Sequence, residues 1–278
     1  MLSIQDLVNK AVRSGGGGGG GGTLHRGAAA DPTAGACESS GNAGDAPAHR
    51  PAILERSRHD APGMPPKNLG GISACACGDL GAARRLRGGG WDPQAAVDKH
   101  GNTPLMWAAG AGHLEVVRWL VEEERVQVLE SNKQGRTALM WAAKNGQQRV
   151  CEWLLQEAPE PRVSVDAQMK DGSRAWDWAV YGGHLPTLAL LAAHPDVDKH
   201  GRNNFGCGAA FWAAAAGNVT TCQWLYELGI DFALVNGAGH TSVHKAAWKG
   251  HHECLKWMIC DDKGPKLVLS LLALLAQK

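Results

Sequence analysis

The sequence predicts an all-α fold in which short pairs of helices stack along one axis, and three observations lead to this prediction. A glycine followed by a similar run of residues recurs at spacings of 34, 37, 34 and 33 residues, at Gly101, Gly135, Gly172, Gly206 and Gly239. A period of this size is typical of stacked supersecondary units. Each copy contains signals for the start and end of a helix, followed by a second apolar stretch at helical spacing. Neither helix could bury its apolar stripe alone, so neighbouring copies are expected to stack.

Residues 1–67, ahead of the repeats, are expected to form a disordered tail. From Ser14 onward Gly, Ala and Pro dominate, and residues 15–22 are all glycine. Such a segment buries too little apolar surface to offset its ordering entropy. A phosphate-binding loop is the alternative for the glycines, but no Gly-Lys-Ser/Thr sequence follows them. Residues 1–13 fit a short amphipathic helix or an organellar presequence, and acidic residues up to Asp60 argue against import.

Residues 68–97 are predicted to be an N-terminal capping unit. The run from Ile72 to Leu86 matches the first full copy with an offset of 34 residues, so that Gly78 matches Gly112. It lacks the Thr-Pro pair that opens the full copy. A terminal repeat exposes one face to water and is expected to be atypical.

Each later unit is expected to open with a tight turn and a capped helix. In four units an Asx residue, which favours a tight turn, stands three positions before the opening glycine: Asp98, Asn132, Asn203 and Asn236. In three units a threonine that can cap the first helix stands two positions after it: Thr103, Thr137 and Thr241. Arg174 and Gly208 replace this threonine in the other two units, so each of those helices is expected to lose a cap worth roughly 1 kcal/mol.

A glycine then ends the first helix and a second helix follows. These signals divide the repeat region, 68–263, into six units: 68–97, 98–131, 132–168, 169–202, 203–235 and 236–263.

The copies resemble ankyrin repeats, in a tryptophan-rich form. The runs Gly-Asn-Thr-Pro-Leu at 101–105, Ala-Ala at 108–109 and Gly-His-Leu-Glu-Val-Val at 112–117 are close to the family consensus. The resemblance implies an all-α ankyrin-repeat solenoid with β-turn or loop tips. It also implies a protein-protein interaction module or adaptor without catalysis or cofactor. The alternative is a targeting or regulatory subunit of an enzyme, or a catalytic activity that the sequence does not reveal.

In this family partners usually dock on the concave face formed by the turn tips and the first helices. Carried over to this sequence, that rule selects the partner-binding residues Lys99, His100, Asn102, Lys133, Gln134, Arg136, Lys144, Asn145, Lys170, Tyr181, Phe205, His240, Trp248 and Lys249. Because all six charged members are Lys or Arg, we expect an acidic partner segment, with Tyr181, Phe205 and Trp248 as aromatic anchors. The alternative is a face that is only solvated.

Eight tryptophans recur at two fixed offsets from the opening glycines. Four lie six residues after the opening glycine of their unit, on the expected first helix: Trp107, Trp141, Trp178 and Trp212. The other four lie eighteen residues after it, on the expected second helix: Trp119, Trp153, Trp224 and Trp257. Because the offsets are fixed, we predict that the tryptophans form two ladders, that is, two rows of buried rings in which each ring packs against the equivalent ring of the next unit. A nucleic-acid platform is the alternative, which the formal net charge of +1 disfavours.

Neither a metal site nor a catalytic group is predicted. His113, His184 and His251 follow a glycine at a position where the family carries a structural histidine. Cys75 and Cys77 have no second cysteine pair at zinc spacing. The eight cysteines are interpreted as reduced thiols of a cytoplasmic protein, with a nuclear location as the alternative. We expect a monomer.

Residues 264–278 are expected to form an apolar C-terminal helix. Its apolar run is about half of the ~20 residues that span a bilayer, so no transmembrane segment is expected. A cap over the last repeat is the preferred role, and a partner helix or a membrane-surface contact are the alternatives.

Overall fold

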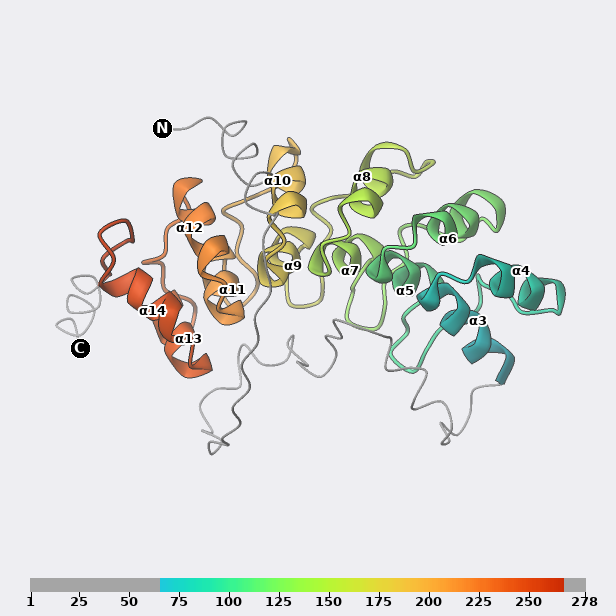
Figure 1. Cartoon of the computed structure of the whole chain (residues 1–278), viewed down its shortest axis with the longest axis horizontal. Helices are drawn as coiled ribbons and strands as arrows, with labels where there is room; N and C mark the ends of the chain where they lie inside the picture. The colour runs from blue at the N-terminus through green and yellow to red at the C-terminus, as the bar shows by residue number, and fades with distance from the viewer. Residues whose placement is uncertain (1–65, 268–278) are drawn as a thin grey trace.

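The computed structural model describes residues 66–267 as a curved stack of helix pairs, with side chains described from Gly70 onward (Figure 1). An inner row follows the concave side: α3 (Pro66–Cys77), α5 (Pro104–Ala111), α7 (Ala138–Lys144), α9 (Ala175–Gly182), α11 (Ala209–Ala216) and α13 (Ser242–Lys249). An outer row covers its back: α4 (Leu80–Gly88), α6 (Leu114–Arg118) with the π-helix η1 (Trp119–Glu123), α8 (Gln148–Gln156), α10 (Leu185–Ala193), α12 (Val219–Glu227) and α14 (His252–Ile259).

The predicted all-α solenoid is confirmed. Each expected unit holds one inner and one outer helix, and residues 66–267 contain no strand beyond an isolated bridge between Ser131 and Thr137. Within the same residues no helix combines the length and the apolar composition needed to cross a membrane. Helix α3 begins at Pro66, two residues before the expected start of the repeats. The rest of the expected tail, and residues 268–278 of the expected C-terminal helix, lie outside the described residues.

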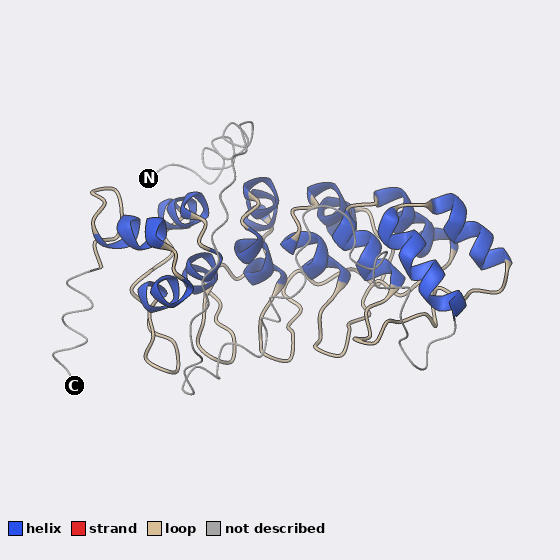
Figure 2. Cartoon of the chain, turned by 60° about the horizontal axis from the view of Figure 1, so that its bottom comes forward, coloured by secondary structure: helices blue, strands red, loops and turns tan. Residues whose placement is uncertain are grey.

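The loops between repeats form a row of fingers on one side of the helices (Figure 2). The predicted Asx turns are present; the Oδ1 of Asn132, for example, accepts the backbone N–H groups of Gln134 and Arg136 at 2.9 Å. Each finger also donates one backbone N–H to its predecessor, over 2.8 to 3.2 Å: Lys133 to His100, Lys170 to Gln134, Asn204 to Asp171, and Gly237 to Phe205. This ladder fixes the fingertips relative to one another.

The inner helices start with three different capping arrangements. Thr103 and Thr137 cap α5 and α7 as predicted, because each hydroxyl accepts the backbone N–H three residues later. At α13 Thr241 and His244 form a capping box, in which the backbone N–H of Thr241 also donates to the Nδ1 of His244 at 3.2 Å. Gly208 supplies no side-chain cap to α11, as expected.

At α9 the side chain of Arg174 forms no capping bond, as expected, but the helix has a capping bond of another kind. The carboxylate of Asp177 reaches back and accepts the backbone N–H of Arg174 at 2.9 Å. Asp177 is buried, and desolvation raises the pKa of its carboxyl group to about 7, against the opposing hydrogen bond and charge of Arg174. Helix α9 therefore has one capping bond, and this bond requires the carboxyl group of Asp177 to be buried.

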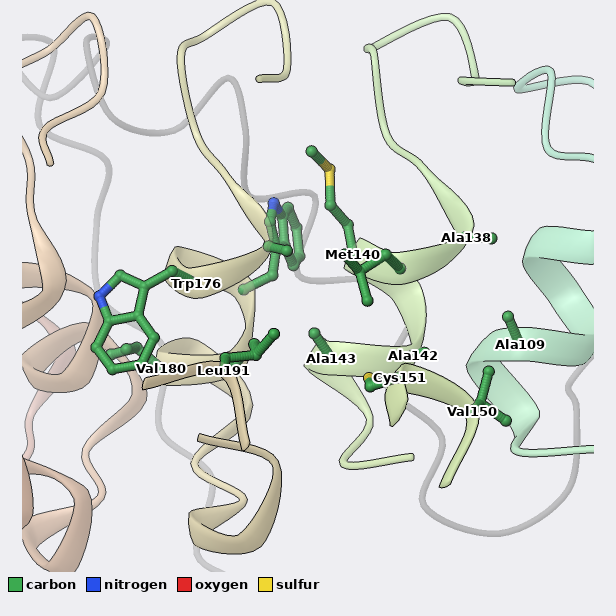
Figure 3. Packing of buried hydrophobic residues seen from close by; sticks show 14 of the residues in the cluster. Ala109, Ala138, Met140, Ala142, Ala143, Val150, Cys151, Trp176, Val180 and Leu191 are labelled. Atoms are coloured by element: carbon green, nitrogen blue, oxygen red, sulfur yellow. The ribbon is translucent and has the colours of Figure 1, made fainter. Parts of the chain in front are cut away.

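Small residues allow the inner helices to pack closely. Figure 3 shows Ala109, Ala142 and Ala143 at the contacts between helices. The outer tryptophans Trp119, Trp153, Trp224 and Trp257 are buried, which confirms the second predicted ladder. The first ladder is only partly a core feature: Trp178 is buried, but Trp107, Trp141 and Trp212 are half-buried, because this position lies on the surface side of each inner helix.

Three histidines, His113, His184 and His251, contact the preceding repeat. The Nε2 atoms of His113 and His251 lie 3.1 and 3.0 Å from the carbonyl oxygens of Ala76 and Ala215 in the preceding repeat. Their rings, and that of His184, lie against the glycine that ends the preceding inner helix. The structural interpretation of His113 and His251 is supported by these contacts.

Candidate partner-binding face

The fingers extend from the side of the stack where the inner helices lie (Figures 1 and 2), and we call the exposed residues of the fingertips and inner helices the inner face. Most of the residues selected from the sequence are exposed on it: Lys99, His100, Lys133, Gln134, Asn145, Lys170, His240, Trp248 and Lys249. Four others are half-buried: Arg136, Lys144, Tyr181 and Phe205.

Asn102 does not belong to the inner face, which corrects its selection. Its side chain is 5% exposed. Its Nδ2 donates to the Oδ2 of Asp98 at 2.8 Å, and its Oδ1 accepts from the Nδ2 of Asn132 at 2.7 Å. Asn102 therefore ties two fingers together, and its amide is used within the fold.

A band of aromatic rings crosses four inner helices. Trp107 and Trp141 stack with centroids 6.1 Å apart and planes inclined by 22°. Farther along, Tyr181 makes edge contacts with Trp178 at 6.4 Å and with Trp212 at 6.2 Å. We call Trp107, Trp141, Trp178, Tyr181 and Trp212 the aromatic floor. The fixed offsets predicted its tryptophans to be core residues, which holds for Trp178, whereas Trp107, Trp141 and Trp212 are half-buried; their place on the inner helices is the signal that could have identified this partial exposure.

Two cations are held against the middle of this floor. The Arg136 guanidinium carbon lies 4.2 Å from the centroid of the Trp178 ring and 5.1 Å from that of Trp141. The Lys144 ammonium lies 5.0 Å from Trp178, 5.7 Å from Trp141 and 6.0 Å from Tyr181. Cation–π attraction over several rings holds both charges in position on the surface.

Partial burial changes the electrostatics of Arg136. Desolvation lowers the pKa of its guanidinium group, and the nearby carboxylate of Asp171 acts in the opposite direction. An arginine nevertheless stays protonated in proteins. A desolvated cation interacts more strongly with an incoming anion than a fully hydrated one, because less water screens the pair.

The three expected aromatic anchors do not form one cluster. Tyr181 belongs to the aromatic floor, and Phe205 lies on the finger before α11. Trp248 is 47% exposed at the end of α13, where the ammonium groups of Lys245 and Lys249 lie 4.5 and 5.3 Å from its ring. A partner that contacts all three would have to extend over several repeats.

A shallow hollow beside the inner face offers little room for a small molecule. It lies where the α9, α11 and α13 repeats meet, has a volume of about 30 Å³, and is lined by residues that include Lys199, Phe211 and Leu234. Ligand pockets usually measure roughly 300 Å³ or more. In residues 66–267 no group of three or more His, Cys, Asp or Glu side chains could hold a metal ion.

Two family models match the chain. The model described as ankyrin repeats (3 copies) matches residues 72–171, and the model described as ankyrin repeats (many copies) matches residues 210–259. Together they cover more than half of the 278 residues. The stretch between them contains Arg174 and Gly208, the two positions at which the capping threonine is replaced.

Proposed function

Because the chain belongs to the ankyrin-repeat family, we propose that it is a protein-binding adaptor that holds an acidic segment of another protein on its inner face, without catalysis of its own. Ankyrin repeats generally mediate protein–protein interactions. The acidic character of the partner is the part of the proposal that depends on this chain's own residues.

The observation that carries the proposal is the local excess of positive charge on the first three full repeats. Their inner face presents Lys99, Lys133, Arg136, Lys144 and Lys170. Asp171 is the acidic neighbour of Arg136 there. The whole chain has a formal net charge of only +1, so the excess belongs to this face. Complementary charge would speed the encounter with an acidic partner and disfavour basic ones.

The rigidity of the inner face supports the same function. The backbone ladder holds each fingertip against the next, and the rings of the aromatic floor hold Arg136 and Lys144. Binding to groups that are already in place loses less side-chain and loop entropy than binding to mobile ones.

We further propose that the protein acts as a monomer in the cytoplasm. Cys75, Cys151, Cys222 and Cys254 are buried, unpaired thiols of the apolar core, which suits a reducing compartment. Light scattering coupled to size-exclusion chromatography tests the monomer, and a fluorescent fusion tests the compartment.

Charge reversal tests the binding proposal. Lys133, Arg136 and Lys144 are changed together to Glu in the full chain, and the proteins captured by the variant and the parent are compared quantitatively. We expect the specifically captured partner to be lost. The matched control reverses Arg149, Lys256 and Lys263, three exposed cations away from the inner face. Equal capture by the two variants would contradict the proposal.

A further inference from the structure

We infer that the α5, α7 and α9 repeats recognise a composite feature of the partner: a large apolar or aromatic side chain and, about three residues away along an extended segment, one or two carboxylates. This inference rests on the proposed function and narrows it to one part of the inner face. It assigns the apolar side chain to Trp107 and the carboxylates to Arg136 and Lys144.

The apolar subsite follows from the small residues that flank Trp107. Residues three and four positions farther along a helix lie on the same side as the first, and here they are Gly110 and Ala111. The equivalent residues of α7 are Lys144 and Asn145, which are long and polar. Gly110 is buried against Trp141 and Asn145 of α7, whereas Ala111 is exposed, so the α5 part of the floor has open space only over Ala111. The indole N–H of Trp107 donates to the Oδ2 of Asp98 at 3.2 Å, which fixes the orientation of the ring.

The acidic subsite follows from the convergence of two cations on one ring. Arg136 precedes α7 and Lys144 ends it, yet both charges lie over Trp178, at 4.2 and 5.0 Å from its centroid. They are therefore within about 10 Å of each other, which is about one Debye length at 0.1 M salt. The Nε of Arg136 is buried without a hydrogen-bond partner among the described residues. Two neighbouring positive charges favour a segment with one or two carboxylates over a neutral one.

The spacing follows from the repeat geometry. The Trp107 and Trp141 rings are 6.1 Å apart and the two cations lie 5.1 and 5.7 Å from the Trp141 ring, so both cations lie within about 12 Å of Trp107. An extended chain advances about 3.3 Å per residue, so about three residues span the two subsites. The partner pattern is thus an apolar residue, two intervening residues and an acidic residue, in either chain direction.

The ring geometry favours a peptide over a single-stranded nucleic acid. Base recognition on aromatic platforms needs ring faces that are free to stack. Here Trp107 and Trp141 already stack on each other at 6.1 Å, and the faces of Trp141 and Trp178 are occupied by Arg136 and Lys144. Binding of an oligonucleotide is therefore one of the outcomes that the experiment distinguishes.

A displayed library of random peptides of about twelve residues, roughly 40 Å when extended, provides the test. It is selected against the full chain at about 0.1 M salt, with oligouridine as a competitor. We expect enrichment of an aromatic or large aliphatic residue three positions from Asp or Glu. Displacement of the selected peptides by oligouridine, or the absence of any such spacing among them, would overturn the inference.

Two variants and one control assign the subsites. Ala111→Arg places a long cationic side chain beside Trp107 and is expected to remove the apolar preference while keeping the acidic one. Lys144→Glu is expected to weaken an enriched peptide about tenfold or more and to shift selection away from Asp and Glu. Arg149→Glu, an exposed change on α8, should leave the selected pattern unchanged. Circular dichroism and thermal unfolding show that each variant is folded.

The outcomes separate this inference from the broader proposal. Peptides that are insensitive to Ala111→Arg and Lys144→Glu but lost on Lys133→Glu or Trp248→Ala would refute the composite subsite and leave binding on the inner face standing. Peptides that respond to none of these changes would refute both. A pattern that changes as much for Arg149→Glu as for Lys144→Glu would show a general charge effect and would also refute the composite subsite.

Discussion

At the scale of single residues, the contact between Gly217 and His251 joins two successive repeats. Gly217 has a φ of +74°, and a Cβ at this position would lie 2.4 Å from the Nδ1 of His251. The ring of His251 is held in turn by the carbonyl oxygen of Ala215. A methyl group at residue 217 thus meets both an unfavourable backbone conformation and a ring that cannot move away without losing its hydrogen bond.

We expect Gly217→Ala to lower the free energy of unfolding by roughly 2–4 kcal/mol, of which about 1 kcal/mol is backbone strain and the rest is overpacking. Urea unfolding of the full chain measures it. Gly229→Ala is the matched control, because Gly229 also has a positive φ, +90°, but an added Cβ there would meet nothing within 4 Å. Equal effects of the two changes would show that the His251 contact is unimportant.

Asp177 predicts a specific dependence of stability on pH. Its pKa is raised from 3.8 to about 7 in the folded chain, chiefly by desolvation. Between these two values the folded state binds more protons than the unfolded state, so this group makes stability fall as pH rises. Asp177→Asn retains an acceptor for the N–H of Arg174 and removes the titration. We expect the stability difference between variant and parent to grow in favour of the variant from about pH 4 to pH 7, by roughly 4 kcal/mol at most. Urea titrations across this range measure it, and a constant difference would contradict the assignment.

At the scale of helices, α9 and α11 share the missing threonine but differ in what replaces it. Gly208 precedes α11 with extended dihedral angles (φ −113°, ψ −169°) that suit a capping residue. An added Cβ would lie 3.3 Å from the carbonyl oxygen of Gly201, a tight contact that a shift of a few tenths of an ångström would relieve. The Nε of Arg174, ahead of α9, forms an ion pair with Asp166 at 3.0 Å, and the arginine side chain is mostly buried.

Restoring a hydroxyl cap is therefore expected to have opposite effects in the two helices. Gly208→Ser should raise stability by about 0.5 kcal/mol, through the new cap and a less flexible unfolded chain. Arg174→Thr should lower it by about 1 kcal/mol or more, because Asp166 loses its partner. Thermal unfolding of both variants beside the parent tests the contrast. A gain in both would mean that the ion pair contributes nothing.

The parts of the fold that local sequence determines were predictable. The Asx turns, the caps of Thr103 and Thr137, and the buried outer tryptophans depend on positions within one repeat, and each was confirmed. The site was less predictable, because its geometry joins residues of different repeats. Arg136 lies over a ring of the next repeat, Trp178, and Asn102 is buried by a bond to Asn132. Neither contact can be inferred from the spacing of residues within one repeat.

At the scale of the whole molecule, the last described repeat carries interior residues on its outward side. Ala247 is exposed, whereas its equivalents Ala109, Ala143 and Ala214 are fully buried under the following repeat. Terminal repeats normally need a polar outer face. We propose that the apolar residues 264–278 shield this side. Deletion of residues 268–278 is expected to lower the Tm by several degrees, because each kcal/mol of lost stability shifts the Tm of a domain of this size by roughly 2–4 °C. Scanning calorimetry measures the Tm of the variant and the parent. An unchanged Tm would contradict the proposed cap.

The distribution of charge over the whole stack predicts how salt affects partner binding. The chain is almost neutral overall, with a formal net charge of +1, so long-range attraction to an acidic partner must come from the cations on the α5, α7 and α9 repeats. Raising NaCl from about 0.1 to about 1 M shortens the Debye length from about 10 Å to about 3 Å, which is less than the separation between neighbouring repeats. We therefore expect association with an acidic peptide to slow about tenfold or more while dissociation changes little. Surface plasmon resonance over a salt series measures both rates.

Lys144→Glu should flatten the dependence of the association rate on salt, and Arg149→Glu on the outer helices should flatten it less. Association that is insensitive to salt would show that the aromatic floor alone, and not its two cations, selects the partner.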